Sequence, residues 1–293
     1  MTTLDPLRTL GELVTERPER AALFERLRLD YCCGGTQTLA EACRQRELEL
    51  DDVRARLEAA DATGAEGDGV ERTDWRRASL AELCAHITTT HHDGLRESLP
   101  RIAGLLSTVV RVHGGGHPEL RGLQQAFTEV REELEPHLAR EESTLFPACI
   151  GLERDTIAVP EALLEEHERE HASVGVQLAA LRRLAGDYCP EQALCGTHRA
   201  LLDALAGFER DLHQHIHEEN NVLLPRARAM SALAARPSRR PGEARELPGE
   251  LTTTRGRRRT TDTPSLPPCC ETWIVEQARS WVTRRPGPGA PPQ

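Results

Sequence analysis

The sequence contains no lysine, so all 37 of its basic residues are arginines. Chemistry that needs a lysine amine, such as Schiff-base formation or Walker-type phosphate binding, is therefore excluded. Aromatic residues make up only 3% of the chain. No apolar run approaches the roughly 20 residues that span a membrane, and the first residues lack the basic start and apolar stretch of a signal peptide. We therefore expect a cytoplasmic protein with no membrane partner.

The sequence also lacks the pattern of a disulfide-bonded protein and an excess of basic charge. The nine cysteines are an odd number at irregular spacings, which argues against a disulfide framework and favours free thiols. The net charge of −10 is uneven, because residues 231–293 carry 11 arginines and only 6 acidic residues. The remaining body of the chain is strongly acidic, and nucleic acid is therefore not expected to be its partner.

Composition and periodicity divide the chain into four parts and predict an all-α fold. Residues 1–60 carry short helical patterns, and residues 61–73 are small, polar and glycine-rich, as in a flexible linker. Residues 74–230 contain four long helical stretches with short connections, which predicts an antiparallel four-helix bundle. Residues 231–293 hold ten of the 19 prolines and are predicted to form a disordered C-terminal tail.

The expected helix bounds follow from turn and capping residues. In the N-terminal part, Gly34 and Gly35 interrupt the chain, and Thr36 or Thr38 can cap the next helix. Pro136 lies inside the second long helix and is expected to kink it or to open one backbone hydrogen bond. A short helix is also possible at 272–282. The four long helices are expected at 79–99, from the loop at 114–118 to 146, at 160–184 and at 191–224.

One pattern of metal-ligand type occurs twice. His137 and Glu141 stand four residues apart and are followed by Leu-Phe-Pro, and His215 and Glu219 repeat this spacing before Leu-Leu-Pro. Residues i and i+4 lie one above the other on a helix, so each pair can hold a metal ion between its side chains. Two copies imply two helices that face a common centre, as in the metal sites of helix bundles.

The four predicted helices together offer a mixed set of nitrogen and oxygen donors. Imidazole and carboxylate without thiolate suit iron, manganese or zinc better than an iron–sulfur cluster. One His per helix with two carboxylates gives six donors, which exceeds a tetrahedral zinc site and fits two metals with bridging carboxylates. The candidates are His86, His91, His92, Asp93, His137, Glu141, His167, His171, His213, His215, His217 and Glu219.

The N-terminal part has a cysteine pair, Cys32 and Cys33, followed by Gly34 and Gly35. Adjacent cysteines rarely form a disulfide with each other without strain, so two thiols are expected. The glycines let the backbone turn sharply and leave the sulfurs accessible. No histidine precedes His86, so a complete metal site within this part is not expected.

These motifs together resemble a known family. The two His-x3-Glu pairs, with His92-Asp93 and Glu170-His171, resemble a hemerythrin-like di-iron domain. The preceding segment Asp-Tyr-Cys-Cys-Gly-Gly at residues 30–35 resembles the N-terminal domain of the repair-of-iron-centres family, the ScdA/YtfE type. The similarity covers about residues 5–230, and the pairing of the two domains is far more specific than either motif alone.

The resemblance implies a cofactor and a ligand set. It implies two iron ions bridged by both glutamates, with one His ligand fewer than hemerythrin-type oxygen carriers have. His171 fits the family pattern better than His167, and His92 fits it better than His91. The implied ligands are His92, His137, Glu141, His171, His215 and Glu219.

The resemblance also implies a function. We expect a protein that repairs iron–sulfur clusters damaged by nitric oxide or oxidants, rather than a conventional enzyme. Cys32 and Cys33 would form a redox-active pair that receives iron or nitric oxide, or contacts the damaged client protein, and the N-terminal domain would support a homodimer. The alternatives are a hemerythrin-like oxygen or nitric oxide sensor or store, and a di-iron nitric oxide or peroxide reductase.

Overall fold

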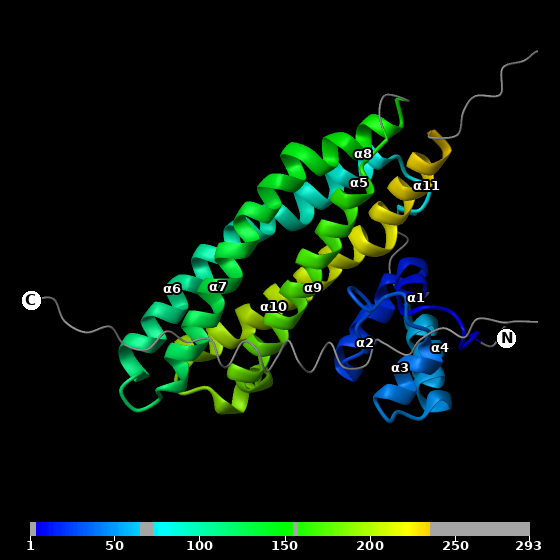
Figure 1. Ribbon diagram of the computed structural model, residues 1–293. Helices are drawn as coiled ribbons and strands as arrows, with labels where there is room; N and C mark the ends of the chain where they lie inside the picture. The colour runs from blue at the N-terminus through cyan, green and yellow to red at the C-terminus, as the bar shows by residue number, and fades with distance from the viewer. Residues whose placement is uncertain (1–3, 65–72, 155–157, 235–293) are drawn as a thin grey trace, which may run out of the picture. The chain divides into compact units, whose positions relative to one another are not determined.

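The computed structural model describes residues 4–64, 73–154 and 158–234, and these residues form helices and connecting turns (Figure 1). Within these ranges the sole β-type pairing is an isolated bridge between Thr9 and Thr38. The predicted all-α fold is confirmed. Residues 235–293, including the possible helix at 272–282, lie outside the described residues. None of the described helices is long and apolar enough to cross a membrane.

Short helices make up the N-terminal part. Thr9 caps α1 and Thr38 caps α3, each through a reciprocal pair of hydrogen bonds with the glutamate three residues later. The buried Arg20 side chain binds Asp61 at 2.6 Å and so ties the end of α4 to this part. The helix α4 extends to residue 64, beyond the position at which the linker is predicted to begin. The helices are α1 (Leu10–Glu16), α2 (Ala21–Leu27), α3 (Leu39–Gln45) and α4 (Leu50–Gly64).

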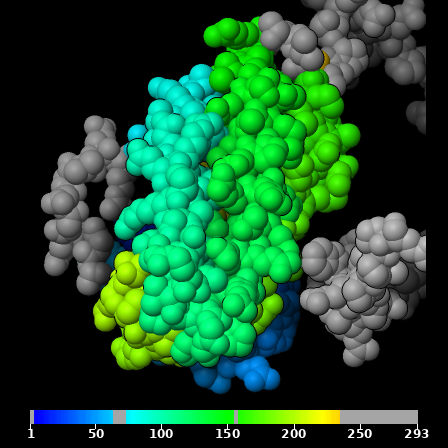
Figure 2. Space-filling model, turned by 90° about the vertical axis from the view of Figure 1, so that its left-hand side faces the viewer, coloured from blue at the N-terminus to red at the C-terminus, as the bar shows by residue number. Residues whose placement is uncertain are grey.

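Four long rods form the bundle, and three of them contain a π-helical turn. The helix α6 contacts α7 and α10, and α9 contacts the same two helices, so the bundle is closed. Figure 2 shows the face on which the first and second rods lie side by side. The rods are α5 (Leu80–Ile87), a π turn (Thr88–His92) and α6 (Asp93–His113); α7 (Glu119–Arg140), a π turn (Glu141–Leu145) and α8 (Phe146–Leu152); α9 (Glu161–Leu184); and α10 (Gly196–Glu218), a π turn (Glu219–Leu223) and α11 (Leu224–Ala234).

The first rod is longer than predicted. It was expected to end at Leu99, before a proline, but α6 passes through Pro100 and ends at His113. Proline removes one backbone hydrogen bond, and the fully buried Ile102 and its apolar neighbours offset that loss by packing in the core. The helix α7 likewise continues through Pro136.

The second and fourth rods also extend beyond their predicted ends. Pro147 and Pro225 each occupy the second position of the helix that follows a π turn. The first turn of a helix does not need these N–H groups, so proline is accepted there. The second rod therefore reaches Leu152 and the fourth reaches Ala234. The fourth rod starts later than predicted, because residues 190–192 form a separate 3₁₀ turn.

The π turns coincide with candidate ligands. One turn ends at His92, and the other two begin at Glu141 and Glu219, the glutamates of the repeated pattern. The local sequence favours this departure from the α-helix. The hydroxyl of Thr88 donates to the carbonyl of Cys84, and Ser143 donates to a carbonyl in the same way, which competes with the helical ladder.

Two apolar clusters lie before and after the buried histidines along each rod. The larger cluster includes Leu99, Phe127 and the core of the N-terminal part. The smaller one contains the apolar residues that end both copies of the repeat, Leu145–Phe146 and Leu223–Leu224. These residues therefore close one end of the polar layer that holds the candidate ligands.

Candidate metal centre

The structure brings all six predicted ligands together in the interior, and it adds His167 to them. Each of the seven side chains is at most 6% exposed. The donor atoms fall into two groups, within each of which all atoms lie no more than 4.8 Å apart. The five-donor half contains His137, Glu141, His167, His171 and Glu219, and the four-donor half contains His92, Glu141, His215 and Glu219.

Both glutamates belong to both halves, with one oxygen in each. Glu141 Oε1 lies 2.8 Å from His137 Nε2, and Glu141 Oε2 lies 3.2 Å from His92 Nε2. Glu219 Oε2 lies 3.1 Å from His171 Nε2, and Glu219 Oε1 lies 3.3 Å from His215 Nε2. This is the arrangement expected of carboxylates that bridge two cations.

Unpartnered polar atoms indicate that this layer fits a cation. Both oxygens of Glu141 and Oε1 of Glu219 are buried without an aligned hydrogen-bond donor. Burial alone would raise the pKa of Glu141, but the imidazoles of His137 and His167 outweigh it and hold that pKa well below 4.5. Two buried carboxylates that stay ionised need positive charge beside them. The imidazole and carboxylate donors suit iron among other first-row metals.

Outer contacts orient three of the imidazoles. A polar side chain binds the Nδ1 atom of each ring, which leaves Nε2 to face the carboxylates. Arg96 and Arg140 in turn bind two of these outer carboxylates. The Nδ1 contacts are His92 with Glu142 at 2.7 Å, His137 with Glu170 at 2.7 Å, and His171 with Asn220 at 2.8 Å.

The structure shows where the alternative candidate ligands lie, His91 or His92 and His167 or His171. His92 lies in the four-donor half, whereas His91 points to a different cluster with His86 and Glu218. His167 and His171 both lie in the five-donor half, with His167 Nε2 only 2.9 Å from Glu219 Oε2. Both histidines therefore reach the same half of the site, because one helical turn separates them on a single face.

Sequence reasoning named Glu170 beside His171 but missed Glu142 and Asn220 as residues that orient the candidate ligands. Glu142 directly follows Glu141, and Asn220 directly follows Glu219. A residue next to a ligand on a helix points about 100° away from it, toward a neighbouring rod. A polar residue directly next to a candidate ligand could therefore have been predicted to orient a ligand on a neighbouring rod.

The cysteine pair is less accessible than predicted. Cys32 is only 5% exposed, and Cys33 is half-buried. Asp30 Oδ1 accepts hydrogen bonds from the backbone N–H groups of both cysteines and so fixes the loop. Gly35 is needed for close packing rather than for a left-handed turn, because a Cβ there would lie 2.7 Å from the Tyr31 carbonyl oxygen.

The two thiols differ electrostatically. The Cys32 thiol donates toward the Cys33 sulfur at 3.9 Å. This contact and burial both raise the pKa of Cys32, whereas at Cys33 the same contact outweighs burial and lowers the pKa. Cys33 Sγ lies 3.4 Å from the backbone oxygen of His171, a candidate ligand. Cys33 is therefore the thiol of the pair that more readily becomes a nucleophilic thiolate.

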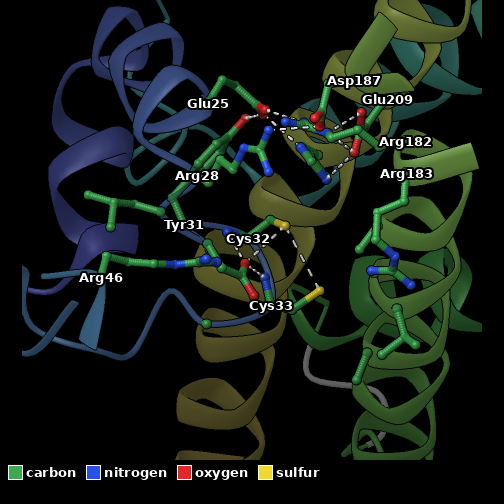
Figure 3. Close-up of a pocket in the computed structure, with 18 residues that line it drawn as sticks. Glu25, Arg28, Tyr31, Cys32, Cys33, Arg46, Arg182, Arg183, Asp187 and Glu209 are labelled. Carbon is green, nitrogen blue, oxygen red and sulfur yellow. Dashed lines mark hydrogen bonds and ion pairs between the residues drawn. The ribbon is translucent and has the colours of Figure 1, made fainter. Parts of the chain in front are cut away.

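A cavity of about 590 Å³ opens beside the pair (Figure 3). Arg28, Arg46, Arg182 and Arg183 line it, together with the two cysteines. Salt bridges to acidic residues of the bundle engage Arg28 and Arg182. In Figure 3 the Cys33 sulfur faces α9, the helix that carries His171.

Side chains of the fourth rod bind the cysteine loop directly. The Asn221 amide donates to the carbonyl oxygens of Tyr31 and Cys32, the latter at 3.0 Å. His217 contacts the Tyr31 carbonyl oxygen, and His213 binds a glutamate of α2. These two histidines, both candidate ligands by sequence, therefore lie at the contact with the N-terminal part.

Asn220 connects the two sites, since it binds His171 and also reaches the Cys32 carbonyl oxygen.

Cys33 is expected to react with iodoacetamide at least about tenfold faster than Cys32, because it is more exposed and has the lower pKa. Peptide mass spectrometry after short labelling of the folded protein measures both rates separately. Cys43, a fully buried thiol of the same part, is the slow control. Equal labelling of Cys32 and Cys33 would contradict the asymmetry.

Comparisons with known proteins place this arrangement in a family. The family model described as "Domain of Unknown function (DUF542)", ScdA_N, matches residues 6–61, and the "Hemerythrin HHE cation binding domain" model matches residues 84–227. The iron–sulfur cluster repair protein YtfE of Pectobacterium atrosepticum is 37% identical over 219 residues, which cover 75% of this chain and 96% of that protein. The chain belongs to the YtfE family. The YtfE protein of Yersinia pseudotuberculosis is 35% identical over the same shares of the two chains. The family suggested by the sequence motifs is thereby confirmed.

Proposed function

We propose that this protein repairs iron–sulfur clusters damaged by nitrosative or oxidative stress in the cytoplasm, by donating iron to them. The observation that supports this most directly is the contact between the two motifs. The cysteine loop packs against the rods that carry the candidate ligands, and Asn220 binds both His171 and the Cys32 carbonyl oxygen. A thiol pair that serves iron transfer needs such proximity to the iron.

In this proposal two iron ions occupy the two halves of the centre, bridged by Glu141 and Glu219. The six ligands predicted from the sequence are joined by His167, so the five-donor half has three imidazoles and the four-donor half has two. Iron in such a set can exchange ligands and change its redox state. The smaller donor set leaves more room for exchange in the four-donor half.

The cysteine pair then has a role in transfer. Cys33, the thiol with the lowered pKa, offers a soft ligand to iron that leaves the centre. The exposed Arg46 and Arg183 side chains on the same cavity suit the approach of an acidic protein surface. The client in this proposal is a protein that carries a damaged iron–sulfur cluster.

Iron transfer can be followed with an isotope. Protein loaded with ⁵⁷Fe is expected to restore activity to a dehydratase whose [4Fe–4S] cluster has lost iron, and Mössbauer spectra should then show ⁵⁷Fe in the repaired cluster. The double variant H137A/E141A should neither hold the label nor repair the client. Full repair by that variant, or a repaired cluster free of ⁵⁷Fe, would refute iron donation from this centre.

Nitric oxide handling is a second candidate, favoured by the smaller donor set of the four-donor half. Two imidazoles and two shared carboxylates leave coordination positions for a small ligand. Anaerobic titration with nitric oxide should then change the optical spectrum of the iron-loaded protein. An unchanged spectrum would exclude this role and leave iron donation untouched.

A further inference from the structure

A second group of metal-ligating side chains lies outside the proposed iron centre. It consists of His86 on α5, His91 in the adjoining π turn and Glu218 at the end of α10. Their facing donor atoms lie within 4.8 Å of one another. We propose that these three residues form a separate binding site for a divalent first-row transition-metal ion.

The distances match those between the ligands of one ion. Glu218 Oε2 lies 3.3 Å from His86 Nε2 and 3.5 Å from His91 Nε2. Tetrahedral coordination with bonds of about 2.0–2.2 Å places ligand atoms about 3.3–3.6 Å apart. Two imidazoles and one carboxylate are a donor set typical of ferrous iron and zinc, and three ligands leave a further position open.

The facing atoms of the two buried ligands have no other partner. His91 Nε2 and Glu218 Oε2 are both inaccessible to solvent and lack a hydrogen-bond partner. The His91 side chain is 4% exposed and that of Glu218 is 7% exposed. A buried imidazole nitrogen and a buried carboxylate oxygen that face each other without an aligned hydrogen bond are costly unless a cation lies between them.

Each ligand is also held from behind through its other polar atom. Such outer contacts are typical of metal sites, because they fix the ring tautomer and the carboxylate orientation. They leave Nε2 of both histidines and Oε2 of the glutamate as the inward donors. The contacts are His91 Nδ1 with Asp211 at 2.8 Å, His86 Nδ1 with the Thr90 hydroxyl at 3.1 Å, and Gln214 Nε2 donating to Glu218 Oε1 at 3.1 Å.

The site is adjacent to the proposed iron centre but shares no ligand with it. His91 precedes His92, and Glu218 precedes Glu219, so the two rods present consecutive residues to different sites. The His91 ring also stacks on the ring of His215, with centroids 5.5 Å apart. His86, whose side chain is 26% exposed and stacks on Trp75, gives this outer site access to solvent.

Metal titration of the full-length, iron-loaded protein tests the site. Co²⁺ is added, free metal is removed, and cobalt and iron per chain are measured together with the visible absorption of bound Co²⁺. The wild-type chain is expected to bind about one more Co²⁺ than the variant H86Q, whose Co²⁺ affinity should fall more than about tenfold. Excess Co²⁺ replaces any iron at the outer site, and the iron that remains should be equal in the two proteins, because His86 is not a candidate ligand of the inner centre.

Two further variants complete the experiment. E218Q keeps the shape of the side chain and should also lose the extra Co²⁺, whereas H117Q, at an exposed histidine of the loop before α7, should retain it. Equal cobalt binding by wild type, H86Q and E218Q would overturn the proposal and leave an ordinary ion-pair cluster. If E218Q disturbs the neighbouring centre, the comparison of H86Q with H117Q alone decides.

Discussion

Replacing Glu141 with alanine is expected to remove nearly all bound iron. The substitution takes one oxygen from the five-donor half and one from the four-donor half, because the carboxylate belongs to both. Loss of even an outer-shell partner typically weakens metal binding about 10–100-fold, and loss of a shared ligand should exceed that range. Metal analysis after purification under identical iron supply measures the effect, and circular dichroism checks that the helices remain.

A matched pair of variants makes this result specific. E132A removes an exposed glutamate from the same rod and should leave the iron content unchanged. H92A removes a donor from the four-donor half alone, so it should retain iron in the five-donor half. An E141A protein with as much iron as E132A would show that the carboxylate is not shared.

Replacing Gly35 with valine is expected to detach the cysteine loop from the bundle. A Cβ at this position would lie 2.7 Å from the Tyr31 carbonyl oxygen and would also overlap the Asn221 side chain that holds the loop. Overpacking of this kind costs about 1–3 kcal/mol of folding stability. The loop can relieve the steric clash only by moving away from the bundle. Hydrogen exchange should therefore increase around residues 30–35, and both Cys32 and Cys33 should be alkylated rapidly.

The proposed iron centre provides the internal reference for this variant. Its candidate ligands all lie on the bundle, so G35V should keep its metal while the proposed repair of a client falls. G94A is the control for the size change, because a Cβ at Gly94 meets nothing within 4 Å. Normal hydrogen exchange around the cysteines in G35V would mean that the contact with Asn221 is not what holds the loop.

The sequence predicted the part of this molecule that depends on spacing along a single helix. His137 with Glu141, and His215 with Glu219, lie on single helical faces, and the i, i+4 rule was enough to bring them together. The rule could not exclude His167, because it lies one turn from His171 and so shares its face. Whether one or both turn inward depends on how α9 packs against its neighbours.

Contacts between distant segments were not predictable in the same way. His213 and His217 carry the residue type of a ligand but bind the N-terminal part, and only the docking of that part reveals it. The predicted helix ends at two prolines were also wrong, because a local sequence signal does not show the backbone that precedes it. Pro147 and Pro225 ended the expected helices, whereas a π turn before each proline lets the rod continue.

The π turns make the hydrogen-bond pattern inside three of the rods as important as residue identity. Each turn holds one more residue than an α-helical turn, so an α-helical path through the same residues would rotate all that follows by about 100°. An α-helical path from Glu141 to Leu145, for example, would turn Phe146 away from the His92 ring, on which it stacks with ring centroids 5.5 Å apart. Residue spacing along a regular α-helix therefore does not set which side chains of the second rod face the interior beyond Glu141. The wide turn decides which face the second rod presents to its neighbours after the candidate ligands.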